Sequence, residues 1–331
     1  MSSLLTPHNI QLSGPTKGAQ GEAKGTVNWR VAEADLPPEV LSYVRDSRSV
    51  STRRAYASDL QHFTVWGGTI PASPEMVASY LASQAMHLSP ATLNRRLASI
   101  AVAHGAKGYS SPTASELVRS VLKGIKRTKG TAQAQAKPLL RDDLFLVLDA
   151  IGDSLKDARD RALLLVGFAG GFRRSELVRL DVADLEFVRH GLVVNLRHSK
   201  TDQEGRGRKI GIPFGRTKHC PVKATETWLQ RAEISGGPIL RPINRHGHTA
   251  SQRLSGEAIA EVLRERLAKA GIAPEGYSGH SLRSGFATSA AMAGVATWRI
   301  RKQTGHASDV MLGHYIRNGE LFADNAAGAL L

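Results

Sequence analysis

Apolar side chains recur at helical spacing through residues 35–127, which predicts a small helical domain. Serine or Ser-Pro pairs stand before several of these rows, as is typical of helix starts. The first two rows, behind Ser51 and Ser73, are Tyr56, Leu60, Phe63 and Val77, Tyr80, Leu81. The next two are Leu93, Leu97, Ile100, which Gly105 can end, and Leu117, Val118, Val121, Leu122, Ile125. Four helices are therefore expected, and we interpret Tyr56 and Tyr80 as core residues.

Two polar segments flank this helical part. Residues 1–34 are rich in Gly, Ser, Thr and Gln without a clear period, which favours a flexible arm. Residues 128–137 contain no large apolar side chain and are expected to form a linker. The linker region is basic, so it either crosses a polyanion or is merely solvated.

The second half of the chain combines helices with three short strands. Helices are predicted at 141–151 and 156–169, and another begins near Arg173 after two glycines. Apolar or alternating runs at 185–188, 192–196 and 209–212 predict a three-stranded antiparallel sheet. Further helices are expected at about 221–233, 255–270, 281–293, 297–304 and 308–316. The fold class is thus mainly α with a small antiparallel β-sheet, with a second domain at 138–318 and an apolar-faced segment at 319–331.

Charge and cysteine content narrow the function. The 331 residues carry 44 Lys and Arg against 29 Asp and Glu, a net charge of +15 that favours a polyanionic partner. Cys220 is the only cysteine, so an intramolecular disulfide and Cys-rich zinc motifs are excluded. No apolar run is long enough for a membrane span and the start lacks a secretory signal pattern, so we expect a cytoplasmic protein without membrane partners.

The stretch from Gly279 to Asn318 holds a group of residues suited to phosphate chemistry. Tyr315 offers a phenol as nucleophile, and the side chains that can neutralise a phosphoryl group are His280, Arg283 and His306. Taken singly, each has a plain structural interpretation: a packed tyrosine, a capping histidine, a surface arginine. Arg173 with Glu176 could equally be a surface ion pair, and Lys200 an ordinary hairpin lysine. The convincing feature is the combination.

In order and spacing, these residues resemble those of the tyrosine recombinases of the phage integrase family. Arg173 and Glu176 match the family's first arginine and its acidic companion, and Lys200 its β-hairpin lysine. His280 and Arg283 match its His-x-x-Arg, His306 its later Gly-His or Gly-Trp, and Tyr315 its nucleophile. The match extends across the second half of the chain, whereas residues 35–127 resemble the family's core-binding domain more loosely.

The resemblance implies a two-domain DNA clamp with a catalytic domain at 138–318. Tyr315 would form a 3′-phosphotyrosyl link, Arg173, Arg283 and His306 would stabilise the transition state, and His280 would handle a proton near Tyr315. Glu176 would hold Arg173, and Lys200 would protonate the leaving 5′ oxygen. No cofactor and no metal are implied. The implied partners are duplex DNA with a specific recombination site and further copies of the chain, which assemble into a tetramer when 319–331 docks on a neighbour.

The resemblance also implies strand exchange through a Holliday junction. It further implies a bacterial, phage-encoded or plasmid-encoded protein located at the nucleoid. The candidate DNA contacts of the helical part are Arg53, Arg54, Arg95, Arg96, Lys123, Lys126 and Arg127. Two alternatives are a type IB topoisomerase, which has the same chemistry, and a DNA-binding protein with a degenerate catalytic domain. The apolar tail disfavours the first, and the intact set of residues disfavours the second.

Overall fold

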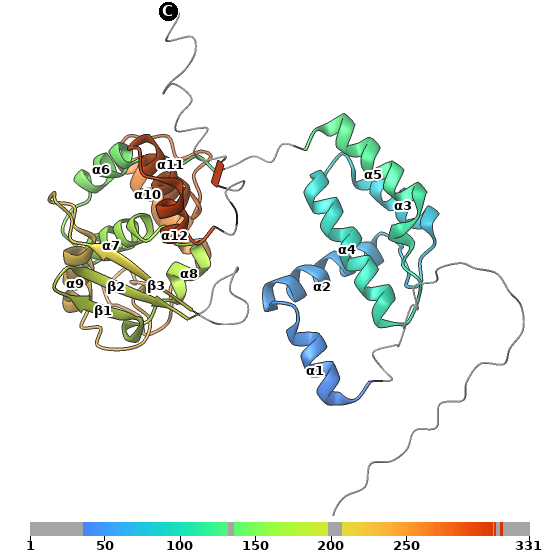
Figure 1. Ribbon diagram of the computed structural model, residues 1–331, viewed down its shortest axis with the longest axis horizontal. Helices are drawn as coiled ribbons and strands as arrows, with labels where there is room; N and C mark the ends of the chain where they lie inside the picture. Colours follow the sequence, from blue (N-terminus) through green and yellow to red (C-terminus); the bar gives the residue numbers. More distant parts are fainter. Residues whose placement is uncertain (1–35, 132–135, 198–206, 307, 309–311, 314–331) are drawn as a thin grey trace, which may run out of the picture. The chain divides into compact units, whose positions relative to one another are not determined.

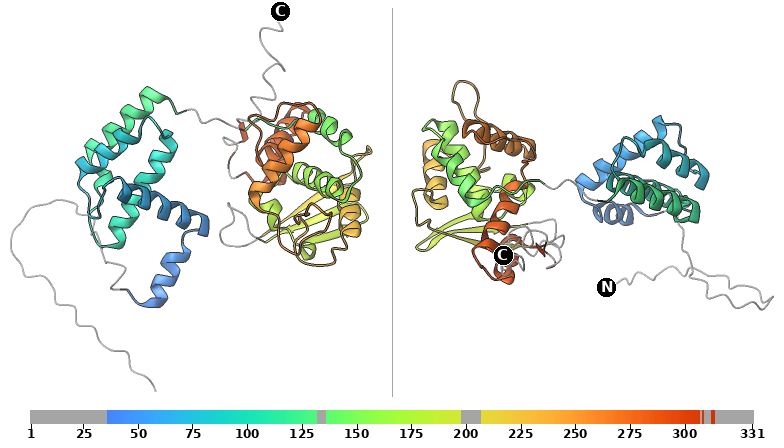
Figure 2. Two further views of the ribbon diagram at one scale, coloured as in Figure 1. Left: turned by 180° about the vertical axis from the view of Figure 1, so that it is seen from behind. Right: turned by 90° about the horizontal axis from the view of Figure 1, so that it is seen from above.

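The computed structural model describes residues 36–131, 136–197, 207–306, 308 and 312–313, and the chain divides into two units between Gln133 and Ala134 (Figure 1). The first unit is helical and the second combines helices with a three-stranded sheet (Figures 1 and 2). Among the described residues, no helix combines the length and the apolar character that crossing a membrane requires. The predicted fold class is confirmed.

The first unit is helical, and most of its helices begin at serine caps. Its elements are α1 (Pro38–Asp46), α2 (Val50–Val65), α3 (Pro74–Gln84), α4 (Pro90–Ala106), the 3-10 helix η2 (Pro112–Ala114) and α5 (Glu116–Lys129). Four α-helices start with a serine whose hydroxyl accepts a backbone N–H three residues on: Ser49, Ser73, Ser89 and Ser115. The apolar rows of α2 to α5 meet in one core around Phe63, Tyr80 and Ile100. The core role expected for Tyr80 is confirmed, since its side chain is fully buried, whereas Tyr56 is half buried and does not belong to this core.

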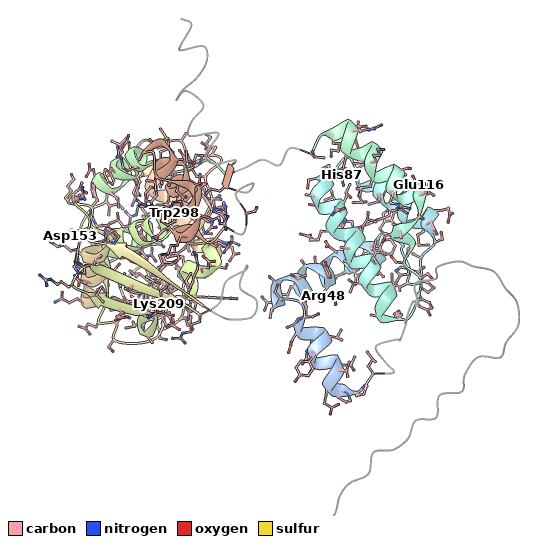
Figure 3. The ribbon with its side chains drawn as sticks, in the orientation of Figure 1. Arg48, His87, Glu116, Asp153, Lys209 and Trp298 are labelled. Atoms are coloured by element: carbon pink, nitrogen blue, oxygen red, sulfur yellow. The ribbon has the colours of Figure 1, made fainter. Side chains whose placement is uncertain are left out.

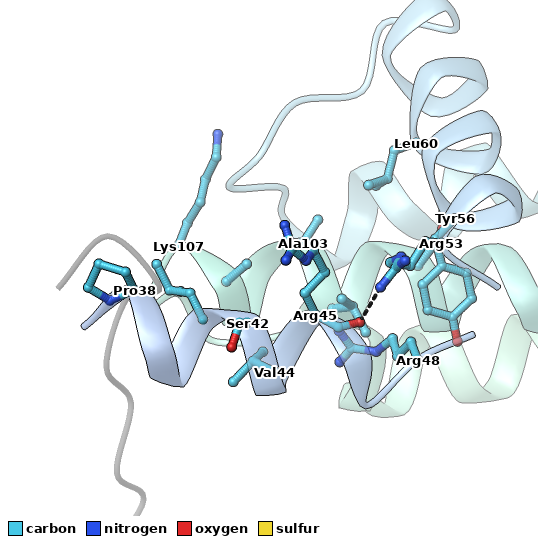
Figure 4. Close-up of a pocket in the computed structure, with 14 residues that line it drawn as sticks. Pro38, Ser42, Val44, Arg45, Arg48, Arg53, Tyr56, Leu60, Ala103 and Lys107 are labelled. Atoms are coloured by element: carbon cyan, nitrogen blue, oxygen red, sulfur yellow. Dashed lines mark hydrogen bonds between the residues drawn. The ribbon is translucent and has the colours of Figure 1, made fainter. Parts of the chain in front are cut away.

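The boundaries differ from the expectation in four places. Helix α2 begins at Val50 behind Ser49, so Ser51 lies inside the helix. Helix α1 was not predicted; it buries none of its residues and lies over a groove of about 690 Å³ that it forms with α2 and α4 (Figure 4). Helix α4 continues past Gly105 to Ala106, and the left-handed residue that follows it is Gly108. Helix α5 runs to Lys129, into the predicted linker, because the ammonium of Lys129 binds the carbonyls of Met86 and Leu88 beyond the end of α3.

In the second unit α7 lies at the centre (Figures 1 and 2). The helices are α6 (Arg141–Asp149), α7 (Leu155–Ala169), α8 (Arg174–Arg179), the 3-10 helix η3 (Val182–Asp184), α9 (Pro221–Arg231), α10 (Gly256–Lys269), α11 (Ser281–Met292) and α12 (Thr297–Thr304). A capping box at Ser154 and Asp157 starts α7, and most of its later residues are buried. Helices α9, α10 and α11 pack against α7.

The sheet has the order β1-β2-β3 and is antiparallel throughout. Its strands are β1 (Leu185–Val188), β2 (Gly191–Leu196) and β3 (Arg208–Pro213), close to the predicted ranges. Val194 on β2 pairs with Leu185 and Ile210, and the inward residues of β2 and β3 are buried. The sheet is therefore held by one apolar face, while Lys209 on the next position of β3 is exposed (Figure 3).

Charged side chains are buried between α7 and α10. Arg266 donates to Asp160 at 2.6 and 2.8 Å and lies 2.6 Å from Asp157, and Arg159 donates to Asp160 at 2.7 Å. Asp160 has no exposed surface, so its charge is compensated inside the protein. This cluster is structural, because it lies in the core between two helices.

Candidate active site

The start of α8 holds Arg173 in place. The backbone N–H of Arg173 donates to Oε2 of Glu176 at 2.9 Å, and its Nη1 donates to Oε1 of the same carboxylate at 2.6 Å. The Glu176 side chain is 2% exposed, so the guanidinium compensates its charge in place of water. Nη2 of Arg173 donates to the Gly305 carbonyl at 3.1 Å, so the same side chain reaches the end of α12.

Arg283 reaches the same turn from α11. It is 1% exposed, and its Nη1 donates to the Gly171 carbonyl at 2.7 Å and to the Thr304 carbonyl. Gly171 has φ +56 and lies between α7 and α8, where a Cβ would approach Thr304 at 2.9 Å. The tight turn at Gly171 therefore lets α11, α12 and the start of α8 meet.

The last residues of α12 present His306. Helix α12 ends at Thr304, and the Gly305 that follows is in the left-handed conformation, with φ 67 and ψ 41. His306 follows; it is 6% exposed, and its Nδ1 lies 2.8 Å from the Thr304 hydroxyl. His280 caps the start of α11 and is exposed. Two imidazoles thus accompany the two arginines that converge on this turn.

A third arginine completes the cluster, and the sequence analysis missed it. Arg208, the first residue of β3, donates to the Gln303 carbonyl at 3.0 Å and the Thr304 carbonyl at 3.2 Å. Its Nη2 also lies 3.6 Å from Oε2 of Glu176. Three guanidiniums against the one carboxylate of Glu176 leave a net charge of +2 (three less one), which suits a phosphate. The only sequence signal was a basic residue at the edge of a polar loop.

Both histidines have lowered pKa values and are neutral at neutral pH, although only His306 is a buried residue. Burial lowers the pKa of His306 to about 3, and the nearby charges of Arg283 and Arg173 act in the same direction. The pKa of His280 is also lowered, first because protein atoms displace water around the ring and then by Arg283 and Arg173. A neutral imidazole has one N–H donor and one acceptor nitrogen, so His280 can accept a proton at neutral pH. His306, with its pKa of about 3, is a weak base and suits hydrogen-bond donation instead.

The pKa of His306 predicts a specific loss of stability in acid. The unfolded chain takes up a proton below the ordinary value of 6.5, whereas the folded chain does so only near 3. Folding stability contributed by neutral His306 is therefore present above pH 6.5 and falls by about 1.4 kcal/mol per pH unit as the pH drops towards 3. Urea unfolding of His306→Asn should show a shallower decline over this range. Comparison at pH 8, where both states are neutral, measures the lost packing alone; an unchanged slope contradicts the prediction.

Lys200 and Tyr315 lie outside the described residues. The structure brings together Arg173, Glu176, Arg283 and His306 and places His280 beside Arg283, whereas it leaves the predicted hairpin lysine and nucleophile untested. Most of the predicted helix at 308–316 also lies outside the described residues. Within the described ranges, no group of three or more His, Cys, Asp and Glu side chains is arranged to hold a metal ion.

The predicted DNA contacts of the first unit differ in exposure. Arg54 is exposed, and Arg53 donates to the Arg45 carbonyl at 2.7 Å (Figure 4). Arg95 is half exposed and makes hydrogen bonds of 2.8 and 2.9 Å to the buried carboxylate of Asp59. This arrangement orients the Arg95 guanidinium at the surface of α4.

Arg96 was predicted as a DNA contact, but its side chain is buried in the first unit. It is 8% exposed, and its Nη1 donates to the Tyr80 hydroxyl at 2.6 Å and lies 2.9 Å from Nδ1 of His62. Its charge is used inside the unit, so we do not retain it as a DNA contact. Lys123 and Arg127 are exposed on α5, and Lys126 is half buried.

Comparison with known proteins shows which protein family this chain resembles. Residues 138–320 match the profile described as "Phage integrase family". The chain is 39% identical over 290 residues to the integrase/recombinase XerD homolog of Selenomonas ruminantium, with 85% of each chain covered. The recombinase Cre of Escherichia phage P1 is 26% identical over 358 aligned positions, which cover 100% of this chain and 98% of Cre. The short motifs at 278–281 and 314–318 resemble Cre, yet along the whole chain the XerD homolog shares more residues.

A solved structure of a recombinase has a similar fold. A crystal structure of the XerH site-specific recombinase bound to its palindromic difH substrate superposes with a TM-score of 0.58 at 18% identity. The superposition covers 90% of this chain and 84% of that one.

Proposed function

Since the chain belongs to the phage integrase family and is a tyrosine recombinase, we propose that it cleaves and rejoins duplex DNA through a 3′-phosphotyrosyl intermediate. The observation that carries this proposal is the convergence of Arg173 and Arg283 on the turn before His306. These side chains come from separate elements and surround one site with a net positive charge. A scissile phosphate is the group that such a site suits.

In the proposed reaction, the Tyr315 oxygen attacks the phosphorus and the bond to the 5′ oxygen breaks. Arg173 and Arg283 donate to the non-bridging oxygens, where charge develops in the five-coordinate transition state. Glu176 keeps Arg173 oriented through its two hydrogen bonds. His306 donates a further hydrogen bond to the phosphate.

Two proton transfers balance this step. The phenol proton of Tyr315 passes to neutral His280, and Lys200 donates a proton to the departing 5′ oxygen. A free tyrosine has a pKa near 10, so a nearby base is needed at neutral pH. The phosphodiester is exchanged for a phosphotyrosyl ester, and a 5′-hydroxyl of a second strand reverses the step. The reaction as proposed draws on no ATP and no metal ion.

We propose that the excess of positive charge on the chain serves to bind DNA. The chain carries a net charge of +15, and Arg54, Arg95, Lys123 and Arg127 are exposed on the first unit. We propose that these side chains contact the DNA of a specific recombination site, with Arg53 and Lys126 at the edge of the contact. Such binding weakens steeply as salt rises. The proposed location is the cytoplasm, at the nucleoid.

Relaxation of supercoils in the manner of a type IB topoisomerase is the weaker alternative. Relatives that cover most of this chain are named recombinases, which favours strand exchange. A degenerate DNA-binding protein is disfavoured because the residues proposed for the phosphate and proton roles are all present in the sequence.

Strand exchange between two labelled duplexes tests the function and the proposed tetramer together. We expect the full chain to produce recombinant strands from duplexes that carry its own captured target sequence. Deleting residues 319–331 should leave covalent cleavage intact and remove strand exchange, because the tail is proposed to dock on the neighbouring copy. Light scattering of the DNA complex reports the stoichiometry. Relaxed DNA without recombinant strands would favour the topoisomerase alternative, and an unchanged stoichiometry would exclude the docking role.

A further inference from the structure

Arg208 binds the end of α12 more extensively than either of the proposed phosphate-binding arginines. Its Nη1 donates to the carbonyls of Lys302 and Gln303 at 3.3 and 3.0 Å, and its Nη2 to that of Thr304 at 3.2 Å. The last carbonyls of a helix have no partner within the helix and carry partial negative charge. One guanidinium from β3 therefore caps the C-terminus of α12.

The approach of Arg208 depends on Gly305. A Cβ on Gly305 would lie 2.5 Å from Nη1 of Arg208, and the residue has φ +67. Glycine is thus required twice, for the left-handed turn and for the close approach of the guanidinium. The turn that leads into His306 is built around the Arg208 side chain.

Arg208 also contacts the group that orients Arg173. Its Nη2 lies 3.6 Å from Oε2 of Glu176, while Oε1 of Glu176 accepts from Arg173. One side chain therefore joins the end of α12, which precedes His306, to the carboxylate that holds Arg173. Because the Arg208 side chain is 22% exposed, these contacts form largely away from water, and burial lowers its pKa.

A second connection between β3 and α12 does not reach the carboxylate. The amide Nε2 of Gln303 donates to the Ala169 carbonyl at 2.9 Å and to the Gly211 carbonyl at 3.2 Å. Gln303 thus links α12 to β3 and to the end of α7. Arg208 is distinguished by its contact with Glu176, which belongs to the site itself.

We propose that Arg208 is a positioning residue, which fixes the turn carrying His306 relative to the Arg173–Glu176 pair so that both meet the same phosphate. The inference rests on the proposed function of this site. A displacement of about 1 Å in a catalytic group can cost about 10²-fold in rate. Arg208 acts through its neighbours, so its removal slows chemistry and leaves DNA affinity nearly unchanged.

The test compares Arg208→Ala and Arg208→Lys with a matched control. Arg161 is also a half-buried arginine that binds carbonyls at a helix end: that of Leu148 in the last turn of α6 and those of Ile151 and Gly152 just after it. Arg161→Ala removes the same kind of cap without touching Glu176 or α12. For each variant, the rate of covalent complex formation at saturating DNA, the DNA dissociation constant and its salt dependence, and the melting temperature are measured.

Arg208→Ala should slow covalent attachment about 100-fold, with a dissociation constant and a salt slope close to those of the parent. Arg208→Lys keeps the charge but loses the fork, so it should recover part of this loss, to within about tenfold of the parent rate. Arg161→Ala should lower the melting temperature and keep the parent rate. If Arg208→Ala does not fold, the lysine variant still carries the test.

Three results would overturn the proposal: a parent-like rate in both Arg208 variants, an equal loss of rate in Arg161→Ala, or a salt slope reduced by about one, which marks a direct phosphate contact. Covalent attachment by the parent protein tests the proposed function separately from the role of Arg208. If the parent forms no covalent complex, the proposed function fails; if it does and the variants match it, only the role of Arg208 fails.

Discussion

Replacing Tyr315 by phenylalanine should abolish covalent attachment of the protein to DNA and leave DNA binding nearly intact. The substitution removes one hydroxyl, which is the proposed nucleophile, and changes neither charge nor ring size. Attachment is measured as a protein–DNA complex that survives denaturing gel electrophoresis, and binding by a mobility shift under native conditions.

Tyr277→Phe is the matched control in the same unit. Tyr277 is half buried, and burial raises the pKa of its hydroxyl, which makes it a poor nucleophile at neutral pH. This variant should attach to DNA at the parent rate. Undiminished attachment by Tyr315→Phe would remove Tyr315 from the proposed chemistry.

Arg283→Ala should slow covalent attachment by about 10²–10³-fold, the loss typical of removing one donor to a transition-state oxygen. It should also destabilise the fold by about 1–3 kcal/mol, because the carbonyls of Gly171 and Thr304 lose a buried donor. The attachment rate is measured at saturating DNA below the melting temperature, so the effect on chemistry is separated from the effect on stability.

Arg266→Ala is the control, for which we expect a loss of stability without a loss of attachment rate. Arg266 is equally buried, yet it pairs with Asp157 and Asp160 between α7 and α10. Its loss leaves the buried Asp160 with Arg159 alone and Asp157 without an arginine, and should lower the free energy of unfolding by about 3 kcal/mol. The folded fraction should still attach at the parent rate. If Arg283→Ala instead kept the parent rate while Arg266→Ala lost it, the assignment of the site would be wrong.

The elements that the sequence predicted well are those with one apolar face. Helices α2 to α5 and strands β2 and β3 each bury such a face, so spacing alone located them. Helix α1 buries no residue, and its boundaries depend on contacts at its ends and on the turn before Ser49. Val40, Leu41 and Val44 stand at helical spacing in residues 38–46, but this row spans little more than one turn and none of it is buried.

The site residues were predictable only as a set. Arg173 and Arg283 stand 110 positions apart (283 less 173), and the carbonyls on which they converge carry no sequence signal. The same limit explains Arg96 and Arg208, whose roles depend on partners brought near by folding: the Tyr80 hydroxyl and the end of α12. A basic residue in a sequence does not disclose whether its charge faces DNA or a carbonyl inside the protein.

The most direct test of the account is the identification of the atom through which the protein joins DNA. Covalent complexes trapped in cells are digested with protease and nuclease, the modified peptide is sequenced by mass spectrometry, and the attached DNA end is determined. The account predicts a phosphate ester between the Tyr315 hydroxyl and a DNA 3′ end, with one sequence enriched in the attached DNA. Attachment through another residue, or to a 5′ end, would contradict it.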